Sequence, residues 1–499
     1  MPPLVPLTFT QPSTHHRSLA LRTQCRQPAA LAGRVMLLAM SLGWSLLMPS
    51  VVMAQHGEDA GPGAGRRPPR GQPGTQPQPG GRRPANVKIA DEAPLPKIDR
   101  ESLPPGYQAP RPIPPYLLDC KEWLLSKDEN PTPKEKNSFN ALKGAGAQLK
   151  GKDDVDLIRK IIRWKLSEFT LKSKREQVFK LREDIIVRDL RFANMTQEVK
   201  NAMLDAILVE APTLFDHCLE PRFNAVLLLT DLNVREATSD GKQQAVPFLP
   251  ACTPLLNVLN NPQQPDIVKI PAAIGAVRYA SPVPTPVDLK HKVVEALFNL
   301  LKNPQSDPWL QMRCAEGLGQ IGFYQNLNKQ PVVLTLLLDV VKDAKRNWFV
   351  RAEAARAIGR LNLDPNVDLK PIAGELANFG LVMATEYQKS HKQSHWSGCF
   401  LNLYFAFWPM DADEKKKGWG LLTLVEKPAF AGHKQIVNAA YRQCIQVIKN
   451  VVTPPGDVTM PEAIKNLSDW IKQNSPNGVN IAPAAQQPPA ANAAQVTGS

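Results

Sequence analysis

A short phrase that recurs four times constrains this chain more than any other feature. In each copy, apolar residues stand three or four positions apart, which is the pattern of one buried helix face. The copies are RFNAVLLLTDLN (222–233), IPAAIGAVR (270–278), LQMRCAEGLGQIG (310–322) and VRAEAARAIGRLN (350–362). A period of about 40 residues is typical of stacked helix pairs. The chain is therefore predicted to share one core among repeated helical units.

The four copies can be aligned position by position. The aligned residues are Thr230, Gly275, Gly319 and Gly359, in steps of 45, 44 and 40. The residues before them are Leu229, Ile274, Leu318 and Ile358, which we expect at one inner position. The small residues one or two positions ahead of these are Ala273, Gly317 and Ala357. We expect helix backbones to approach closely there.

A second phrase follows the first three copies. It reads PLLNVLNNP from Pro254, ALFNLLKNP from Ala296 and TLLLDVVKD from Thr335. Each unit is thus predicted to be an A helix, a loop and a B helix. The polar residue inside the B phrase recurs as Asn257, Asn299 and Asp339, in steps of 42 and 40. These three are candidates for a partner-binding face, or alternatively bond to the next inter-repeat loop.

These phrases resemble HEAT repeats, most clearly in VRAEAARAIGRLN with its Val-Arg start, paired alanines and Ala-Ile-Gly ending. The resemblance is clear over 289–362 and weaker back to Arg222. It implies an all-α, right-handed α-solenoid that usually serves as a protein-binding scaffold, and it also occurs in bilin lyases and their relatives. Pro271, inside an A helix, departs from the pattern. The alternative is an ordinary helical bundle with chance self-similarity.

Composition divides the chain into six predicted parts. They are a signal peptide (1–54), a disordered Pro/Gly/Arg-rich tether (55–113), a helical N-terminal or capping region (114–215), HEAT-like repeats (216–390), a C-terminal helical cap (391–474) and a disordered tail (475–499). In the capping region Leu157, Ile158, Ile161, Ile162 and Leu166 form one apolar stripe. Asp153 and Asp154 are expected to cap its helix.

The first 54 residues have the features of an export signal. They contain no Asp or Glu, and an apolar run from Val35 to Met48 precedes Val52-Met53-Ala54. This order predicts cleavage before Gln55 and export to the periplasm or cell envelope. The alternative is an uncleaved signal that anchors the chain in the inner membrane. No later segment is apolar enough to span a bilayer.

The tether carries paired arginines at Arg66, Arg67, Arg82 and Arg83, which could contact anionic surfaces. Export and the lack of interleaved aromatic residues argue against nucleic acid as the partner. The formal net charge of +14 is spread over the chain and names no partner. A protein partner remains the expectation, and a polyanion-binding module is a further alternative.

The stretch after the repeats is the most aromatic part of the chain. Trp396, Tyr404 and Trp408 are candidates for an exposed recognition surface. Alternatively, they cover the open face of the last repeat as a cap.

The sequence contains one candidate group of metal ligands. His391, His395 and Cys399 are spaced i, i+4, i+8, which would place three metal ligands on one face of a continuous helix. Gly398 and a missing fourth ligand count against it. Six cysteines follow residue 54, an even number that permits disulfides in an exported protein. No catalytic motif or cofactor-binding motif is present, so we expect a non-enzymatic scaffold without a cofactor, with a lyase or cofactor-handling module as the alternative.

Overall fold

The computed structural model describes residues 117–474 apart from 193, 239–241, 283 and 392–394. The chain divides into two units, Met1–Ala85 and Asn86–Ser499, and the described residues all belong to the second. The predicted signal peptide, the tether with its four arginines and the C-terminal tail lie outside the described residues. The described part is mostly helical with almost no strand, which confirms the all-α class. No described helix has the length and apolarity needed to span a membrane.

The elements follow one another along the chain with short connections. The N-terminal helices are α2 (Pro133–Leu142), α3 (Lys152–Ser167), α4 (Val178–Glu183) and α5 (Gln197–Glu210). The middle helices are α6 (Leu219–Thr230), α7 (Cys252–Asn260), α8 (Asp266–Ala280), α9 (Val287–Lys302), α10 (Pro308–Ile321), α11 (Val332–Lys342), α12 (Trp348–Ile358) and α13 (Leu369–Ser390). The C-terminal helices are α14 (His395–Phe407), α15 (Ala412–Lys416), α16 (Leu421–Leu424), α17 (Lys434–Val452) and α18 (Met460–Asn474). Between α6 and α7, strands β1 (Asn233–Arg235) and β2 (Val246–Pro247) form a short antiparallel pair.

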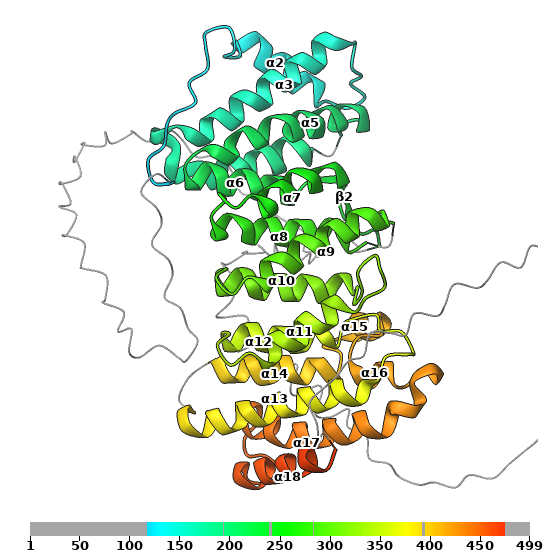
Figure 1. Cartoon of the computed structure of the whole chain (residues 1–499). Coiled ribbons are helices and arrows are strands. Elements are labelled where there is room, and N and C mark those ends of the chain that lie inside the picture. The colour runs from blue at the N-terminus through cyan, green and yellow to red at the C-terminus, as the bar shows by residue number, and fades with distance from the viewer. Residues whose placement is uncertain (1–116, 193, 239–241, 283, 392–394, 475–499) are drawn as a thin grey trace, which may run out of the picture. The chain divides into compact units, whose positions relative to one another are not determined.

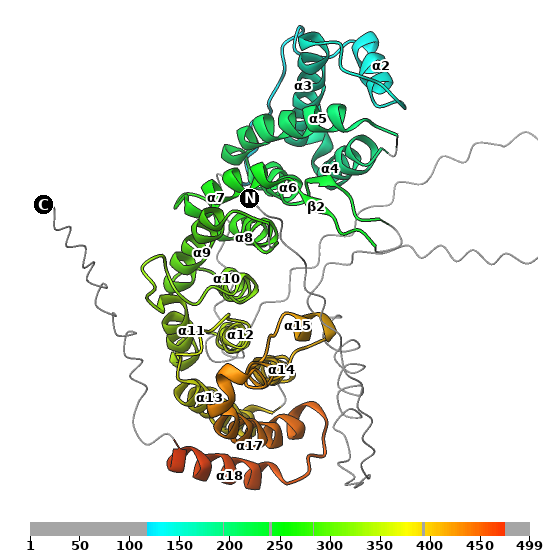
Figure 2. The same cartoon turned by 90° about the vertical axis from the view of Figure 1, so that its right-hand side faces the viewer.

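The middle helices pack in two layers. Helices α6, α8, α10, α12 and α14, here the A layer, each contact the next in succession. Helices α7, α9, α11 and α13, here the B layer, do the same. Each of α8, α10 and α12 also packs on the B-layer helix that precedes it. Figure 1 shows the succession, and Figure 2 shows α7, α9 and α11 on one side with α8, α10 and α12 on the other.

The predicted helices are present where the phrases placed them. The four copies of the first phrase fall on α6, α8, α10 and α12, and the three copies of the second fall on α7, α9 and α11. Helix α8 continues through Pro271. The B-layer helices α7 and α9 end just before Pro262 and Pro304, because proline cannot donate to the preceding turn.

The predicted register is wrong at α8. The residues that cap the helix starts are Pro265, Asp307 and Asn347, in steps of 42 and 40. These steps match those of the B-layer phrase, whereas the predicted alignment used 44 between Gly275 and Gly319. Counted from the helix starts, Leu318 corresponds to Ala276 and not to Ile274. Accordingly, Leu318 and Ala276 are 0% exposed, whereas Ile274 is 44% exposed.

Small residues let neighbouring A-layer helices touch at the corrected position. A methyl group added at Gly275 would collide with Thr230 of α6, and one at Gly317 would collide with Val277 of α8. One added at Gly319 would lie 2.8 Å from the Cα atom of Ala357. The close approach predicted at Gly317 and Ala357 is therefore observed, and Gly275 occupies the position predicted for Ala273.

The N-terminal region packs its predicted apolar stripe inward. Ile158, Ile161, Ile162 and Leu166 are buried on α3. However, α3 is capped by Gly151 and begins at Lys152, so Asp153 and Asp154 lie in its first turn and do not cap it. Carboxylates in a first turn still interact favourably with the helix dipole.

The C-terminal helices cover α13 and α14, the last helices of the B layer and the A layer. Helices α17 and α18 both pack on α13, and α17 also packs on α14. Cys444 and Leu467, from α17 and α18, are fully buried beside Gly380 of α13.

Candidate protein-binding surface

Apolar side chains line the outward side of the A layer. Ile267, Trp309 and Phe349 are each the second residue after the cap of their helix. Ile267 is 46% exposed, Trp309 is 47% exposed and Phe349 is half-buried. Ile274 lies two turns after Ile267 and so shares its side of α8. Because α8, α10 and α12 are neighbours, these four side chains make an apolar row, the name used below.

The apolar row differs from ordinary surface scatter. Single exposed apolar residues are normal on soluble proteins. Here, equivalent positions of three adjacent helices are apolar, and one of them is a tryptophan, a residue enriched at interface hot spots. The ring of Phe349 also lies 5.9 Å from that of His395, which brings α14 into contact with the end of the row.

Charged residues occupy the same side nearer the carboxyl ends of α10 and α12. Arg313 donates to Glu316 at 2.6 Å, and Asn402 of α14 donates to Glu353 at 3.0 Å. Arg356 and Arg360 both donate to one oxygen of Glu414 on α15, at 3.2 and 2.5 Å. The charged cluster, as named below, consists of Arg313, Glu316, Glu353, Arg356, Arg360 and Glu414.

The pKa values of the two buried carboxylates of the charged cluster, Glu353 and Glu414, are shifted in opposite directions. Burial raises the pKa of Glu353, and the nearby Arg356 only partly offsets this effect. Burial would also raise the pKa of Glu414, but the Arg360 guanidinium, the Met410 N–H and Arg356 together hold that pKa below its ordinary value. Glu414 is therefore the ionised partner of the two arginines.

A buried polar ladder runs through the A layer and was not predicted. Its members stand four residues after each helix cap, and they are Arg222, Lys269, Gln311 and Arg351. All four are buried. The Arg351 Nε atom donates to the Val341 carbonyl at 2.9 Å, and the Gln311 amide donates to the Ser306 carbonyl at 2.6 Å.

The ladder also joins one unit to the next. Arg222 donates to Gln264 at 2.9 Å, and Arg346 donates to Gln311 at 2.5 Å. Burial lowers the pKa of Arg351 to about 10. Because Arg222, Gln311 and Arg351 donate to acceptors inside the protein, their role is structural. The equal spacing from the helix caps is the signal that could have identified them in the sequence.

The predicted B-layer residues are exposed at equivalent positions. Asn257, Asn299 and Asp339 lie on α7, α9 and α11 with solvent-exposed side chains. Asp339 pairs with Lys342 of its own helix at 3.2 Å. The geometry leaves these side chains available to a partner, and their role in binding stays a prediction.

Two of the three predicted aromatic candidates lie in the core. Trp396 is 2% exposed, packs against Trp348 with ring centroids 5.2 Å apart and donates to the Ser390 carbonyl. Tyr404 is 9% exposed. Only Trp408 is partly accessible. Trp396 and Tyr404 therefore offer no surface to a partner in this structure.

The predicted metal ligands do not share a continuous helix. Helix α13 ends at Ser390, so His391 lies beyond it, whereas His395 and Cys399 belong to α14. Burial lowers the pKa of His395 and raises that of the Cys399 thiol, which disfavours the thiolate that a metal would need. Within the described ranges, the close group of possible ligands is instead Cys120, Cys218 and Glu220.

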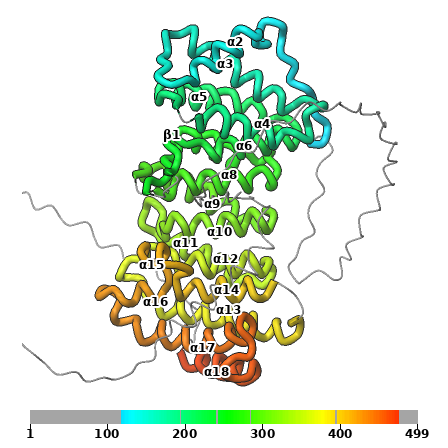
Figure 3. The backbone as a smooth tube through the Cα atoms, turned by 180° about the vertical axis from the view of Figure 1, so that it is seen from behind, coloured from blue at the N-terminus to red at the C-terminus, as the bar shows by residue number. Residues whose placement is uncertain are grey.

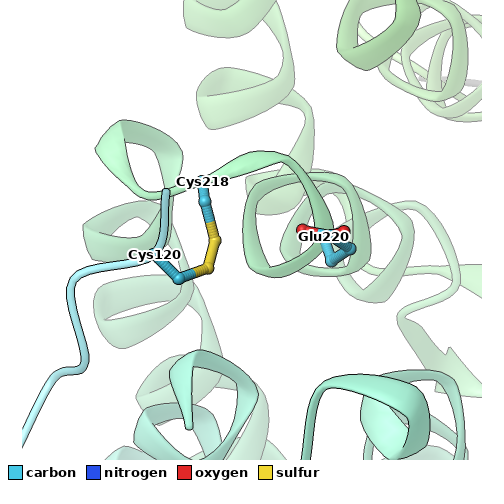
Figure 4. A group of neighbouring side chains, drawn as sticks. All are labelled: Cys120, Cys218 and Glu220. Carbon is cyan, nitrogen blue, oxygen red and sulfur yellow. A yellow bond between two sulfur atoms is a disulfide. The ribbon is translucent and has the colours of Figure 1, made fainter. Parts of the chain in front are cut away.

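That group is organised by a covalent bond. Cys120 and Cys218, which are 98 residues apart, form a disulfide beside Glu220, as Figure 4 shows. The bond ties the segment before α2 to the start of α6. Its sulfur atoms are therefore not free to bind a metal ion. Cys252, Cys314, Cys399 and Cys444 are free thiols in the core.

Comparison of the chain with protein families, with curated proteins and with solved structures gives no match.

Proposed function

We propose that this chain is an exported, right-handed α-solenoid of the HEAT type that acts as a protein-binding scaffold in the cell envelope. Two layers of helices in regular succession support the architecture, together with the repeated helix caps and the repeated contact between small residues. The apolar row carries the functional part of the proposal, because a partner would remove Ile267, Trp309 and Phe349 from water.

Two observations support export. The order of basic, apolar and small residues before Gln55 is that of a cleaved signal peptide. The Cys120–Cys218 disulfide fits an oxidising compartment, because such bonds are rare in the cytosol. We expect mass spectrometry of the envelope fraction to find a mature N-terminus at Gln55. Intact peptides that span Ala54 and Gln55 in that fraction would count against cleavage.

Site-specific photo-crosslinking in the native envelope tests the scaffold. A photoreactive phenylalanine analogue replaces Trp309 in the A layer, Asn299 in the B layer or Glu462, an exposed residue of α18 that serves as the control. We expect position 309 to give a discrete heterologous adduct and position 462 to give none. Adding Ile267→Glu should abolish the adduct without changing the melting temperature, because Ile267 is exposed.

The same experiment separates the two candidate faces. In a further arm the photoreactive group replaces Glu295, an exposed residue one turn before Asn299 on α9. An adduct from position 295 that disappears when Asn257→Ala, Asn299→Ala and Asp339→Ala are added, with folding retained, would place the partner on the B layer. The absence of heterologous adducts from both layers would contradict the scaffold function itself.

A further inference from the structure

The side of α12 that carries the apolar row continues beneath α15. Phe349 and Arg356 are seven residues apart and so lie on one side of the helix. Phe349 is partly open to solvent, whereas Arg356 is covered by the segment that follows α14. It donates there to Glu414 and, at 3.7 Å, to the sulfur of Met410. Figures 2 and 3 show α15 as a short element beside α12 and α14.

One carboxylate makes the main polar attachment of α15. Glu414 is the only residue of this five-residue helix that is buried. Its Oε1 atom accepts from both Arg356 and Arg360, and its Oε2 atom accepts from the Met410 N–H at 2.7 Å. The flanking attachments are a Gly420 N–H bond to the Gly359 carbonyl at 2.6 Å and the Arg360 guanidinium 4.7 Å from the Trp419 ring.

The arginine pair has more donors than Glu414 uses. A guanidinium group carries five N–H donors in a fork that matches a carboxylate bidentately. Within the described part of the chain, Nε of Arg356 and both Nε and Nη1 of Arg360 are buried without a hydrogen-bond partner. An unsatisfied buried donor is unfavourable. The two guanidinium groups therefore have donors for more carboxylate oxygens than Glu414 supplies.

The other two carboxylates of the charged cluster have partners of their own. Arg313 is paired with Glu316, and Glu353 receives the Asn402 amide. Lys417 lies over the Trp419 ring at 4.5 Å and adds a further positive charge near the segment. Once Glu414 is removed, Arg356 and Arg360 have no other carboxylate bonded to them within the described residues.

We propose that α15 is an internal occupant of a binding site for an acidic peptide, in which Glu414 holds the place of a partner's Asp or Glu side chain. The partner's carboxylate displaces Glu414 from Arg356 and Arg360, and its neighbouring apolar side chains lie on the apolar row. This inference rests on the proposed scaffold function and specifies the partner as an acidic segment that also carries apolar residues.

Displacement can be measured on the mature full-length protein. The probe is fluorescein-labelled hexaglutamate, with hexaglutamine as the uncharged control peptide. If α15 covers the site for nine-tenths of the time, removal of the competitor should tighten binding about tenfold. We therefore expect Glu414→Gln to bind hexaglutamate about tenfold more tightly than the wild type. Glu414→Gln combined with Arg356→Gln should lose that gain.

A matched control separates this effect from net charge. Glu426→Gln removes an exposed carboxylate that pairs with Lys434 at 2.8 Å, so it changes the net charge equally. It should bind hexaglutamate as the wild type does. Equal affinities of Glu414→Gln and Glu426→Gln for hexaglutamate, with both variants folded, would overturn the proposal.

Hydrogen exchange gives a second readout that needs no variant. Saturating hexaglutamate should speed amide exchange in residues 408–420 of the wild type, whereas hexaglutamine should not. Unchanged exchange at saturation would equally overturn the proposal. A persistent crosslink from position 309 together with that result would leave the scaffold function standing and remove only the acidic-peptide site.

Discussion

At the scale of single residues, the same apolar signal has opposite structural meanings at Ile274 and Leu318. Both precede a glycine in a recurring phrase, yet Leu318 is fully buried and Ile274 is 44% exposed. The difference arises because the cap of α8 places the buried position of this helix at Ala276. That is two residues after Ile274, the residue that the glycine alignment assigns to it. Ile274 is exposed on the A layer and is available to a binding partner, whereas the buried Leu318 can contribute only to the stability of the fold.

The pair gives a direct test of the corrected register. Leu318→Asp places a charge without a partner in the core and should lower the free energy of unfolding by more than about 3 kcal/mol. Ile274→Asp should change it by less than about 0.5 kcal/mol, as is usual at the surface. Urea unfolding curves provide the comparison. Equal losses in the two variants would contradict the register.

The charged cluster gives a pH-dependent prediction. The pKa of Glu414 is lowered from 4.5, so its ionised pairing stabilises the fold above that value and is lost as the pH falls through the folded pKa. We expect Glu414→Gln to weaken the acid dependence of the melting temperature below about pH 4.5. Glu353, whose pKa is raised, contributes with the opposite sign as the pH rises. A wild-type acid profile in Glu414→Gln would contradict the assigned ion pairs.

At the scale of elements, the A layer depends on close contact between helix backbones. A methyl group at Gly359 would collide with the Ala406 carbonyl of α14, and this backbone atom cannot move aside cheaply. Gly398, inside α14, is exposed, and the nearest atom that its methyl group would meet is 3.9 Å away. Close packing therefore requires a glycine at position 359, whereas packing does not require one at position 398.

Alanine substitution distinguishes these reasons. Gly359→Ala should lower the free energy of unfolding by about 1–3 kcal/mol through overpacking. Gly398→Ala should raise it by up to about 1 kcal/mol, because alanine is the better helix former. Thermal unfolding of both variants measures the difference. Stabilisation by Gly359→Ala would show that α12 and α14 do not meet at this point.

The loops between successive units share one construction. Side-chain oxygens of Asn261, Asn303 and Asp343 accept the N–H two residues on, at 2.8, 3.0 and 2.9 Å. Asp307 and Asn347 then cap the next helix through their own side chains. Such Asx turns fix the chain direction locally. The regular helix starts of the A layer follow from this shared turn.

At the scale of the whole described molecule, the Cys120–Cys218 bond links the segment ahead of α2 to the repeated helices. In the chain-entropy model, a closed loop of about 100 residues stabilises the fold by about 4–5 kcal/mol. We expect a reductant, or the double change Cys120→Ser and Cys218→Ser, to lower the midpoint of denaturant unfolding. The double variant should not respond further to reductant. A midpoint insensitive to reduction would show that this segment is not held by the disulfide.

The sequence alone was sufficient to predict the all-α class and the places of the repeated helices. Apolar spacing and helix-ending prolines such as Pro262 and Pro304 act over a few residues. The position of each helix can therefore be recognised from its local sequence. Recurrence of whole phrases then indicated that neighbouring units are equivalent. The buried stripe of α3 follows from the same kind of local pattern.

The tertiary structure alone decided which surfaces are available. Whether Ile274 faces solvent depends on where α8 meets α6 and α10, and whether Trp396 is buried depends on α12. The Arg356–Glu414 contact and the Cys120–Cys218 bond join residues 58 and 98 positions apart. Periodicity along a chain specifies which side of a helix is apolar. It carries no information on what covers that side, because this depends on helices that meet only after folding.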